Sequence, residues 1–162
     1  MRKGRRIAVD VGKARIGVAI SDQDGILATP FETVPRDLAS LDNTVSLIRV
    51  AVEDYAFLEL YVGLPIGLGG NSTPSTDDAV LVGEALASAL ELPVRYIDER
   101  LTTVSAAANL RLAGKTSKSS RSVIDQEAAA IILEQALQQE KQLGSAPGRS
   151  HLELVEAGVV SS

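Results

Sequence analysis

A chain of 162 residues has room for one domain with a substantial core, and its 45% hydrophobic and 23% charged residues are typical of a soluble globular protein. The absence of cysteine excludes disulfides, cysteine-ligated zinc and thiol nucleophiles, and a single histidine, His151, argues against a Ser-His-Asp triad. No apolar run approaches the roughly 20 residues of a membrane-spanning helix, and the basic start is not followed by the uninterrupted apolar segment of a signal peptide. We therefore expect a cytoplasmic protein that does not contact membranes.

The first third of the chain is expected to begin a sheet. Residues 5–11 and 15–21 are β-prone and are separated by a glycine-containing turn at residues 12–14, which predicts a hairpin. A third strand is expected at residues 29–34. Residues 38–55 place apolar side chains three or four positions apart, which is the period of an amphipathic helix.

The middle of the chain predicts a strand, a loop and a helix. Residues 58–65 form a short apolar run that ends in Gly and Pro, typical of a strand covered on both faces. The glycines of residues 66–76 resemble a phosphate cradle, but the lysine of a P-loop is missing, so we favour a surface loop. An Ala- and Leu-rich helix over residues 77–90 would start at Thr76 or Asp77.

The last third predicts one more strand and two helices. The strand is expected at residues 92–98, followed by a helix that Thr102 would cap and Gly114 would end. The Ser- and Lys-rich residues 115–121 are expected to be mobile. Residues 122–142 are predicted to form the last helix.

The chain is expected to divide into one domain, residues 1–142, and a C-terminal tail, residues 143–162. The tail contains Gly, Ser and Pro and has no clear hydrophobic period, so it is predicted to be flexible. Alternatively, its segment HLELVEAGVV could pair as a strand with a partner. Nothing in the sequence indicates an oligomeric state.

The predicted order β-β-β-α-β-α-β-α-α is typical of an α/β protein with a mixed sheet and helices on its faces. Three segments of this chain run from apolar residues into a carboxylate, at Asp10, Glu99 and Asp125. A carboxylate at the end of a buried run must be hydrated, paired or bound to a cation. Because cysteine is absent and histidine occurs once, such acids point to a hard divalent ion, Mg²⁺ or Mn²⁺. Asp10 and Glu99 would lie at strand ends, where open α/β sheets collect functional groups.

Each of these acids also has a structural interpretation. Ser122 precedes Asp125 by three residues, which is a capping arrangement at a helix start. Asp10 could bind main-chain amides of the turn that follows it. Asp98 and Glu99 are neighbours in an expected strand, so only one of them can face a given site.

Four motifs, DVGKARIGVAISD, GLP, DERLTT and IDQEAAAIIL, occur in this order and together resemble the YqgF family, also called the RuvX family, of ribonuclease H-like nucleases. The match covers residue 5 to about residue 140. The resemblance implies a ribonuclease H-like, mixed five-stranded sheet whose first three strands are antiparallel, with helices on both faces. It also implies that Asp10, Glu99 and Asp125 are the divalent-metal ligands of a phosphodiesterase, with precursor 16S rRNA or branched DNA as its substrate.

Three carboxylates suit the metal-dependent phosphodiester hydrolysis that the resemblance implies. Phosphodiester hydrolysis requires neutralisation of charge on the attacking and the leaving oxygen, which two metal ions about 4 Å apart can supply. Asp10, on the central first strand, is the candidate bridging ligand. Glu99 and Asp125 would each complete the shell of one ion, and a water molecule would be the nucleophile.

The net charge of −5 argues at first against a nucleic-acid partner, but the charges are distributed unevenly. Residues 21–91 contain twelve acidic and two basic residues, whereas residues 100–124 contain five basic residues and no acidic one. One face could therefore be basic, although charged residues on an ordinary solvated surface are the alternative. The candidate nucleic-acid contacts are Lys13, Arg15, Arg100, Lys115, Lys118 and Arg121.

Two of these candidates have an equally good structural interpretation. Arg15 lies within one hairpin of Asp10 and could contact a phosphate or instead form a salt bridge with a structural carboxylate. Arg100 follows Glu99 directly, so in an extended strand it would face the opposite side.

Several functions remain compatible with the sequence. The first is an endonuclease or exonuclease that matures the 5′ end of precursor 16S rRNA, with ribosomal particles as further partners. A Holliday junction resolvase-like DNA nuclease and a catalytically silent nucleic-acid-binding module on the same fold are the alternatives. Actin-like ATPases also begin with an Asp-x-Gly hairpin, but they need two such domains and this chain has room for one.

Overall fold

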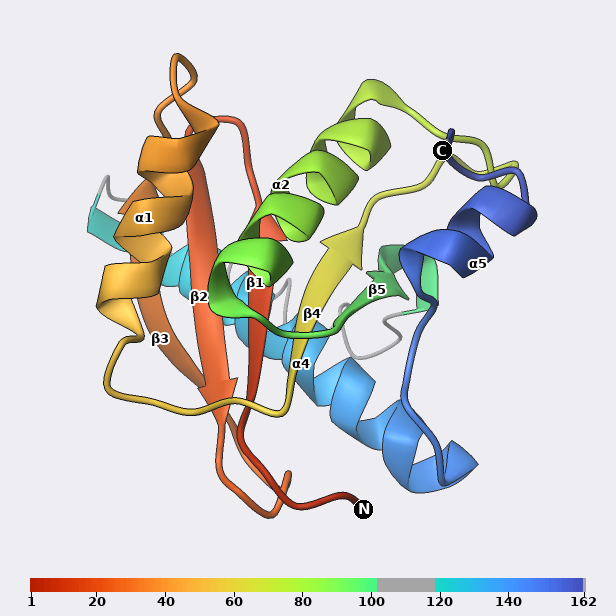
Figure 1. The fold of residues 1–162 in the computed structure, drawn as a ribbon, viewed down its shortest axis with the longest axis horizontal. Coiled ribbons are helices and arrows are strands. Elements are labelled where there is room, and N and C mark those ends of the chain that lie inside the picture. The colour runs from red at the N-terminus through yellow and green to blue at the C-terminus, as the bar shows by residue number, and fades with distance from the viewer. Residues whose placement is uncertain (102–118, 162) are drawn as a thin grey trace.

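The computed structural model describes residues 1–101 and 119–161 and contains one five-stranded sheet in the order β3-β2-β1-β4-β5 (Figure 1). β1 pairs with β2 and β2 with β3 in antiparallel fashion, whereas β1–β4 and β4–β5 are parallel. The expected mixed sheet with antiparallel first strands is therefore confirmed. The strands are β1 (Arg6–Val11), β2 (Arg15–Ser21), β3 (Ala28–Pro35), β4 (Glu59–Leu64) and β5 (Val94–Asp98).

Helices cover both faces of the sheet. α1 (Leu41–Ala51) and α2 (Pro74–Leu90) lie on one face and α4 (Ser119–Leu143) lies across the other, as Figure 1 shows. The expected helix ending at Gly114 falls outside the described residues, as does most of residues 115–121. The described helices are α1 (Leu41–Ala51), α2 (Pro74–Leu90), α4 (Ser119–Leu143) and α5 (His151–Glu156), with a 3₁₀ turn at Glu99–Leu101.

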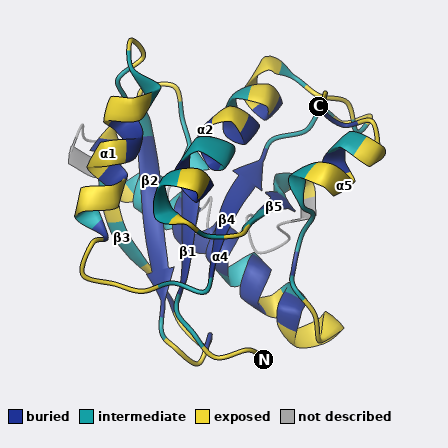
Figure 2. Ribbon diagram, in the orientation of Figure 1, coloured by how far each residue is buried: buried dark blue, intermediate teal, exposed yellow. Residues whose placement is uncertain are grey.

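The two faces of the sheet are packed with side chains of different size. Alternate residues of a strand point to opposite faces, so Ile7 and Val9 of β1 join the large aliphatic core under α1 and α2. Ala8 and Ala19 face α4 and pack against Ala129 and Ala136 of that helix. Small residues on both sides allow α4 to lie close to the sheet, and the central strands β1, β2 and β4 are mainly buried (Figure 2).

A buried ion pair anchors the C-terminal half of α4. Arg6, at the start of β1, is fully buried, and its Nη2 donates to Oε2 of Glu140 at 2.9 Å. Arg2 bridges the Oε1 atoms of Glu140 and Glu59, at 2.5 and 2.8 Å. Buried charges require such partners, and this network fixes α4 to the first residues of β1 and β4.

Two predicted helix starts are wrong. The N-cap of α2 is Thr73 rather than Thr76 or Asp77, and the Thr76 hydroxyl accepts from Thr73 N at 2.9 Å in a reciprocal capping box. Pro74 then occupies the first turn, where its missing N–H costs no hydrogen bond. α4 is already helical at Ser119, so Ser122 lies inside the helix and does not cap it. The capping interpretation of Asp125 is thereby removed.

The C-terminal residues are packed on the domain, contrary to the expected flexible tail. Arg149 exchanges two main-chain hydrogen bonds with Tyr96, at 2.7 and 3.0 Å, and so covers the edge of β5. α5 follows with Ser150 as its N-cap, and Leu154, Val159 and Val160 enter the core with α1 and α2. A six-residue helix is too short to show a hydrophobic period, and long-range burial stabilises it.

Within the residues that the structure describes, no helix has both the length and the apolar character that a membrane crossing would demand.

A pair of leucines in α5 tests whether the C-terminal segment stabilises the domain. Leu154 is fully buried and Leu152 is 65% exposed. We expect Leu154→Ala to lower the free energy of unfolding in urea by about 2–3 kcal/mol and Leu152→Ala to leave it nearly unchanged. Equal, small effects of both substitutions would mean that the segment is dispensable.

Candidate active site

Asp10 lies near the end of the central strand β1, on the face that α4 covers. Its side chain points the same way as that of Ala8, two residues earlier, which packs under α4. In the sheet, Asp10 is paired with Gly17 of β2, and Gly63 of β4 follows Val62, the partner of Val9. Asp10 is thus flanked in both neighbouring strands by a residue without a side chain.

Gly63 leaves the space that Glu99 uses. A Cβ at Gly63 would lie 2.7 Å from Oε1 of Glu99 and would overlap the side chain of Ile132 of α4. Glu99 comes directly after β5 and begins the 3₁₀ turn. Burial, together with the charges of Asp10 and Asp98, raises the pKa of Glu99 to about 7.

Gly17 leaves the space that α4 uses. A Cβ on Gly17 would overlap the carbonyl group of Asp125, so the main chain of the helix rests directly on β2 at this point. Asp125 is therefore brought to the strand that pairs with β1 at Asp10. Burial and the nearby charge of Asp125 raise the pKa of Asp10 to about 6.

Arg15 provides a positive partner for Asp125. It lies two residues before Gly17 and on the same face of β2, and its Nε donates to Oδ2 of Asp125 at 2.6 Å. Of the two interpretations of Arg15, the structure shows a salt bridge, and its partner is one of the candidate site acids.

Asp98 follows Ile97, which packs under α4, so its side chain lies on the opposite face of β5, where it is bound by Arg100. Nη2 of Arg100 donates to Oδ2 of Asp98 at 2.8 Å, and Arg100 N donates to Oδ1 at 2.9 Å. Although burial opposes ionisation, these bonds hold the pKa of Asp98 below its usual value. Nη1 of Arg100 also reaches the carbonyl of Gly67 at 3.4 Å. Of the two adjacent acids, the structure brings Glu99 to Asp10.

The remaining basic candidates are placed less fully. Lys13 is exposed on the turn between β1 and β2. Arg121 belongs to α4, and its side chain is not among those described; Lys115 and Lys118 lie outside the described residues.

The turn between β1 and β2 is fixed by an ion pair that was not predicted from the sequence. Arg36 follows β3, donates from Nη1 to Gly12 O at 3.0 Å, and forms a two-pronged bond to Asp78 of α2, with both distances 2.6 Å. Its main-chain N donates to Ala14 O at 2.9 Å. Arg36 is one of only two basic residues between positions 21 and 91. Its isolation among acidic residues was the feature of the sequence that could have indicated an ion pair.

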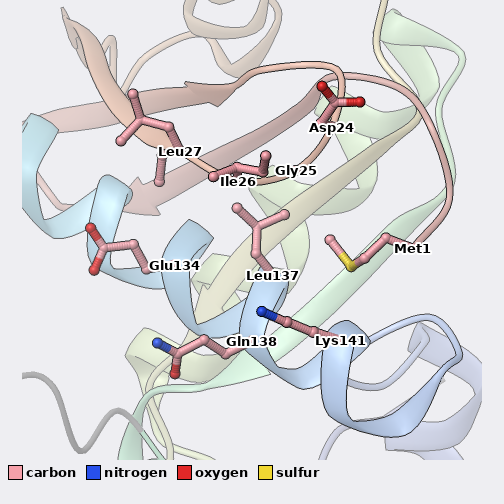
Figure 3. A pocket seen from close by; sticks show the side chains of 10 residues that line it. Met1, Asp24, Gly25, Ile26, Leu27, Glu134, Leu137, Gln138 and Lys141 are labelled. Carbon is pink, nitrogen blue, oxygen red and sulfur yellow. The ribbon is translucent and has the colours of Figure 1, made fainter.

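A separate groove lies at the other end of α4, away from the three acids. That groove, of about 440 Å³, is lined by residues of the β2–β3 connection and of α4, among them Ile26, Leu27 and Leu137, together with Met1 (Figure 3). None of the three acids contributes to it.

The donor set fits a hard divalent cation. Burial, together with like charges nearby, raises the pKa values of two half-buried carboxyl groups, and a bound cation would favour their charged forms. In the described part of the chain, no three acidic, histidine or cysteine side chains are yet arranged as a metal site. Arg15 holds one oxygen of Asp125 in this conformation.

Fold and site together define a ribonuclease H-like nuclease. A family model described as "RuvX: Holliday junction resolvase" matches residues 4–139, and the chain therefore belongs to the RuvX family. This is a family of nucleases, which are hydrolases acting on phosphodiester bonds.

Relatives and a solved structure agree with this. A protein of Clavibacter michiganensis is 55% identical over 149 residues, covering 91% of each chain. One of Streptomyces avermitilis is 51% identical over 150 residues, covering 91% of this chain and 94% of the relative. Both are named "Putative pre-16S rRNA nuclease". RuvC of T. thermophilus, solved with a Holliday junction, shares the fold with a TM-score of 0.60 at 13% identity, over 88% of this chain and 98% of that chain.

The raised pKa values predict how stability depends on pH. Between about pH 4 and pH 7 the folded state holds more protons than the unfolded state at Asp10 and Glu99, so the free energy of unfolding falls as pH rises through this window. Asp10→Asn removes one of the repelling charges. Without divalent ions, it should raise the free energy of unfolding by about 1–2 kcal/mol at about pH 8 and flatten the pH dependence.

Chemical denaturation at several pH values measures this effect. Asp54→Asn, at an exposed position, is the control and should change neither the stability nor its pH dependence appreciably. A destabilised Asp10→Asn protein at about pH 8 would contradict the electrostatic account.

Proposed function

We propose that this protein is a divalent-metal-dependent nuclease that matures the 5′ end of precursor 16S rRNA, with Asp10, Glu99 and Asp125 as its metal ligands. One observation carries the proposal. Asp10 on the central strand lies between two glycines, which admit Glu99 from one side and the α4 main chain at Asp125 from the other.

The three acids would differ in how rigidly the fold holds them at the metal. Asp10 lies on a paired strand in the middle of the sheet and is the natural shared ligand. Glu99 is carried by a short turn at the end of β5, and Asp125 by a helix fixed against β2. Mg²⁺ or Mn²⁺ bound there would neutralise charge on the attacking and leaving oxygens of the phosphodiester.

The protein's own cations would bind and orient the nucleic-acid backbone. Lys13 lies on the turn that follows β1, so its ammonium group can reach a phosphate next to the cleaved bond. Arg36 and Asp78 hold this turn in place and would set the position of Lys13. The single histidine of the sequence, His151, lies beside Glu84, with Nδ1 3.5 Å from its carboxylate. Among the described residues around Asp10, the available proton acceptors are therefore carboxylates.

The choice of precursor 16S rRNA rests on the relatives' name. With it we propose a cytoplasmic location and ribosomal particles as partners. A four-way DNA junction is the second candidate, because the family model is described as a Holliday junction resolvase and the fold matches RuvC bound to such a junction. Cleavage of precursor rRNA fragments and four-way junctions, side by side, decides between them. Faster cleavage of the junction would overturn the rRNA proposal.

The adjacent acids Asp98 and Glu99 provide a matched pair for testing the site. Glu99→Gln should lower the rate of Mg²⁺- or Mn²⁺-dependent cleavage about 100-fold or more, because charge stabilisation by a metal ion contributes several kcal/mol. Asp98→Asn should retain most of the activity, since Asp98 faces Arg100. The rates are measured on both substrates under single-turnover conditions.

Two results would contradict the proposal. One is equal loss in both variants, which would indicate a general structural effect. The other is binding of both substrates by the wild-type protein without cleavage in either metal, which would establish a silent binding module.

A further inference from the structure

We propose that Arg15 occupies the metal's place at Asp125 while no ion is bound, and that it competes with the ion for this carboxylate. The inference rests on the proposed function, because it concerns the same site. It makes Arg15 a residue that weakens metal binding and that becomes available to a substrate phosphate when the metal enters.

The direction of Arg15 follows from the strand. Arg15, Gly17 and Ala19 alternate on the face of β2 that α4 covers. The absence of a side chain at Gly17 brings the helix close, and the long Arg15 side chain then meets Asp125. A charge-assisted bond of 2.6 Å is at the short end of the range for such pairs.

The main chain around Arg15 is held without this ion pair. Gly12 N donates to Arg15 O at 3.0 Å, and Arg15 is paired with Pro35 of β3. Arg36 binds the carbonyl groups of Gly12 and Ala14 on the same turn. Release of Asp125 therefore requires only a rotation of the Arg15 side chain, which is 35% exposed and has solvent to move into.

Asp125 is likewise held without Arg15. Its carbonyl group rests on Gly17, and α4 is anchored at its other end by the buried pair of Arg6 and Glu140. A cation at hydrogen-bond distance from the same carboxylate repels a divalent ion, and this repulsion is strong in a half-buried site.

Two possible roles of Arg15 predict opposite changes in metal affinity when its side chain is removed. If Arg15 orients Asp125 as an outer partner of a metal ligand, its removal weakens metal binding. If Arg15 competes with the metal, its removal strengthens binding. The freed guanidinium suits a phosphate better than an ammonium would, because it can donate two parallel hydrogen bonds.

Titration of the full chain with Mn²⁺, without nucleic acid, measures the sign of this change in affinity. The electron paramagnetic resonance signal of free Mn²⁺ reports how much of the ion is bound. Arg15→Gln should bind Mn²⁺ about tenfold more tightly than the wild type, as expected for the loss of one nearby positive charge. Lys13→Gln is the matched control, because it removes the same charge from the same hairpin at an exposed position, and it should change the affinity by less than about twofold.

Unchanged or weaker Mn²⁺ binding by Arg15→Gln would overturn the inference, as would equal strengthening in Lys13→Gln. Asp10→Asn separates this from a failure of the proposed function. If Asp10→Asn binds Mn²⁺ as well as the wild type, the metal site and the proposed nuclease mechanism are both wrong.

A measurement on the unaltered protein gives a second test. The Nε–Hε resonance of Arg15 should shift and its hydrogen exchange should accelerate when Mg²⁺ is added, because the bond to Asp125 is lost. A resonance that keeps its position and protection at saturating Mg²⁺ would also overturn the inference.

Discussion

The close approach of acidic groups to Asp10 is the constraint on which this structure depends, and two glycines in the neighbouring strands permit it. Any side chain at Gly63 would occupy the position of Glu99, and any side chain at Gly17 would push away the α4 main chain at Asp125. Three segments distant in sequence therefore meet at one strand end because two side chains are missing. Burial of these groups and the repulsion between them raise the pKa values of Asp10 and Glu99.

The rest of the fold keeps this unfavourable arrangement together. Alanines on both the sheet and α4 let the helix lie close, and the buried pair of Arg6 and Glu140 fixes its far end. Arg36 and Asp78 fix the turn beside Asp10. Stability is thus supplied by packing and by buried ion pairs away from the site, as is common where function requires like charges to lie near one another.

Much of the fold could be predicted from the sequence because its signals are local. The strand periods, the turn at Gly12 and the apolar run before Asp10 depend on neighbouring residues, and all appear in the structure at nearly the expected positions. The motifs also identified the family correctly. The role of the three acids as metal ligands stays a prediction.

The remaining features depend on contacts between residues far apart in the chain. Gly17 and Gly63 look like ordinary weak positions in a strand, and their role becomes visible only when α4 and Glu99 are placed. Arg36 meets Asp78 across 42 positions. Leu154 is buried by the other core elements and lacks a periodic pattern of its own, so the C-terminal segment was expected to be flexible.

We propose that Gly17 and Gly63 allow Glu99 and Asp125 to reach a metal ion bound at Asp10. A crystal structure with Mn²⁺, in which anomalous scattering locates the ion, tests it most directly. We expect manganese bound by Asp10 together with Glu99, Asp125 or both, on the α4 face of the sheet. Manganese bound elsewhere while Asp10 contacts no ion would contradict it.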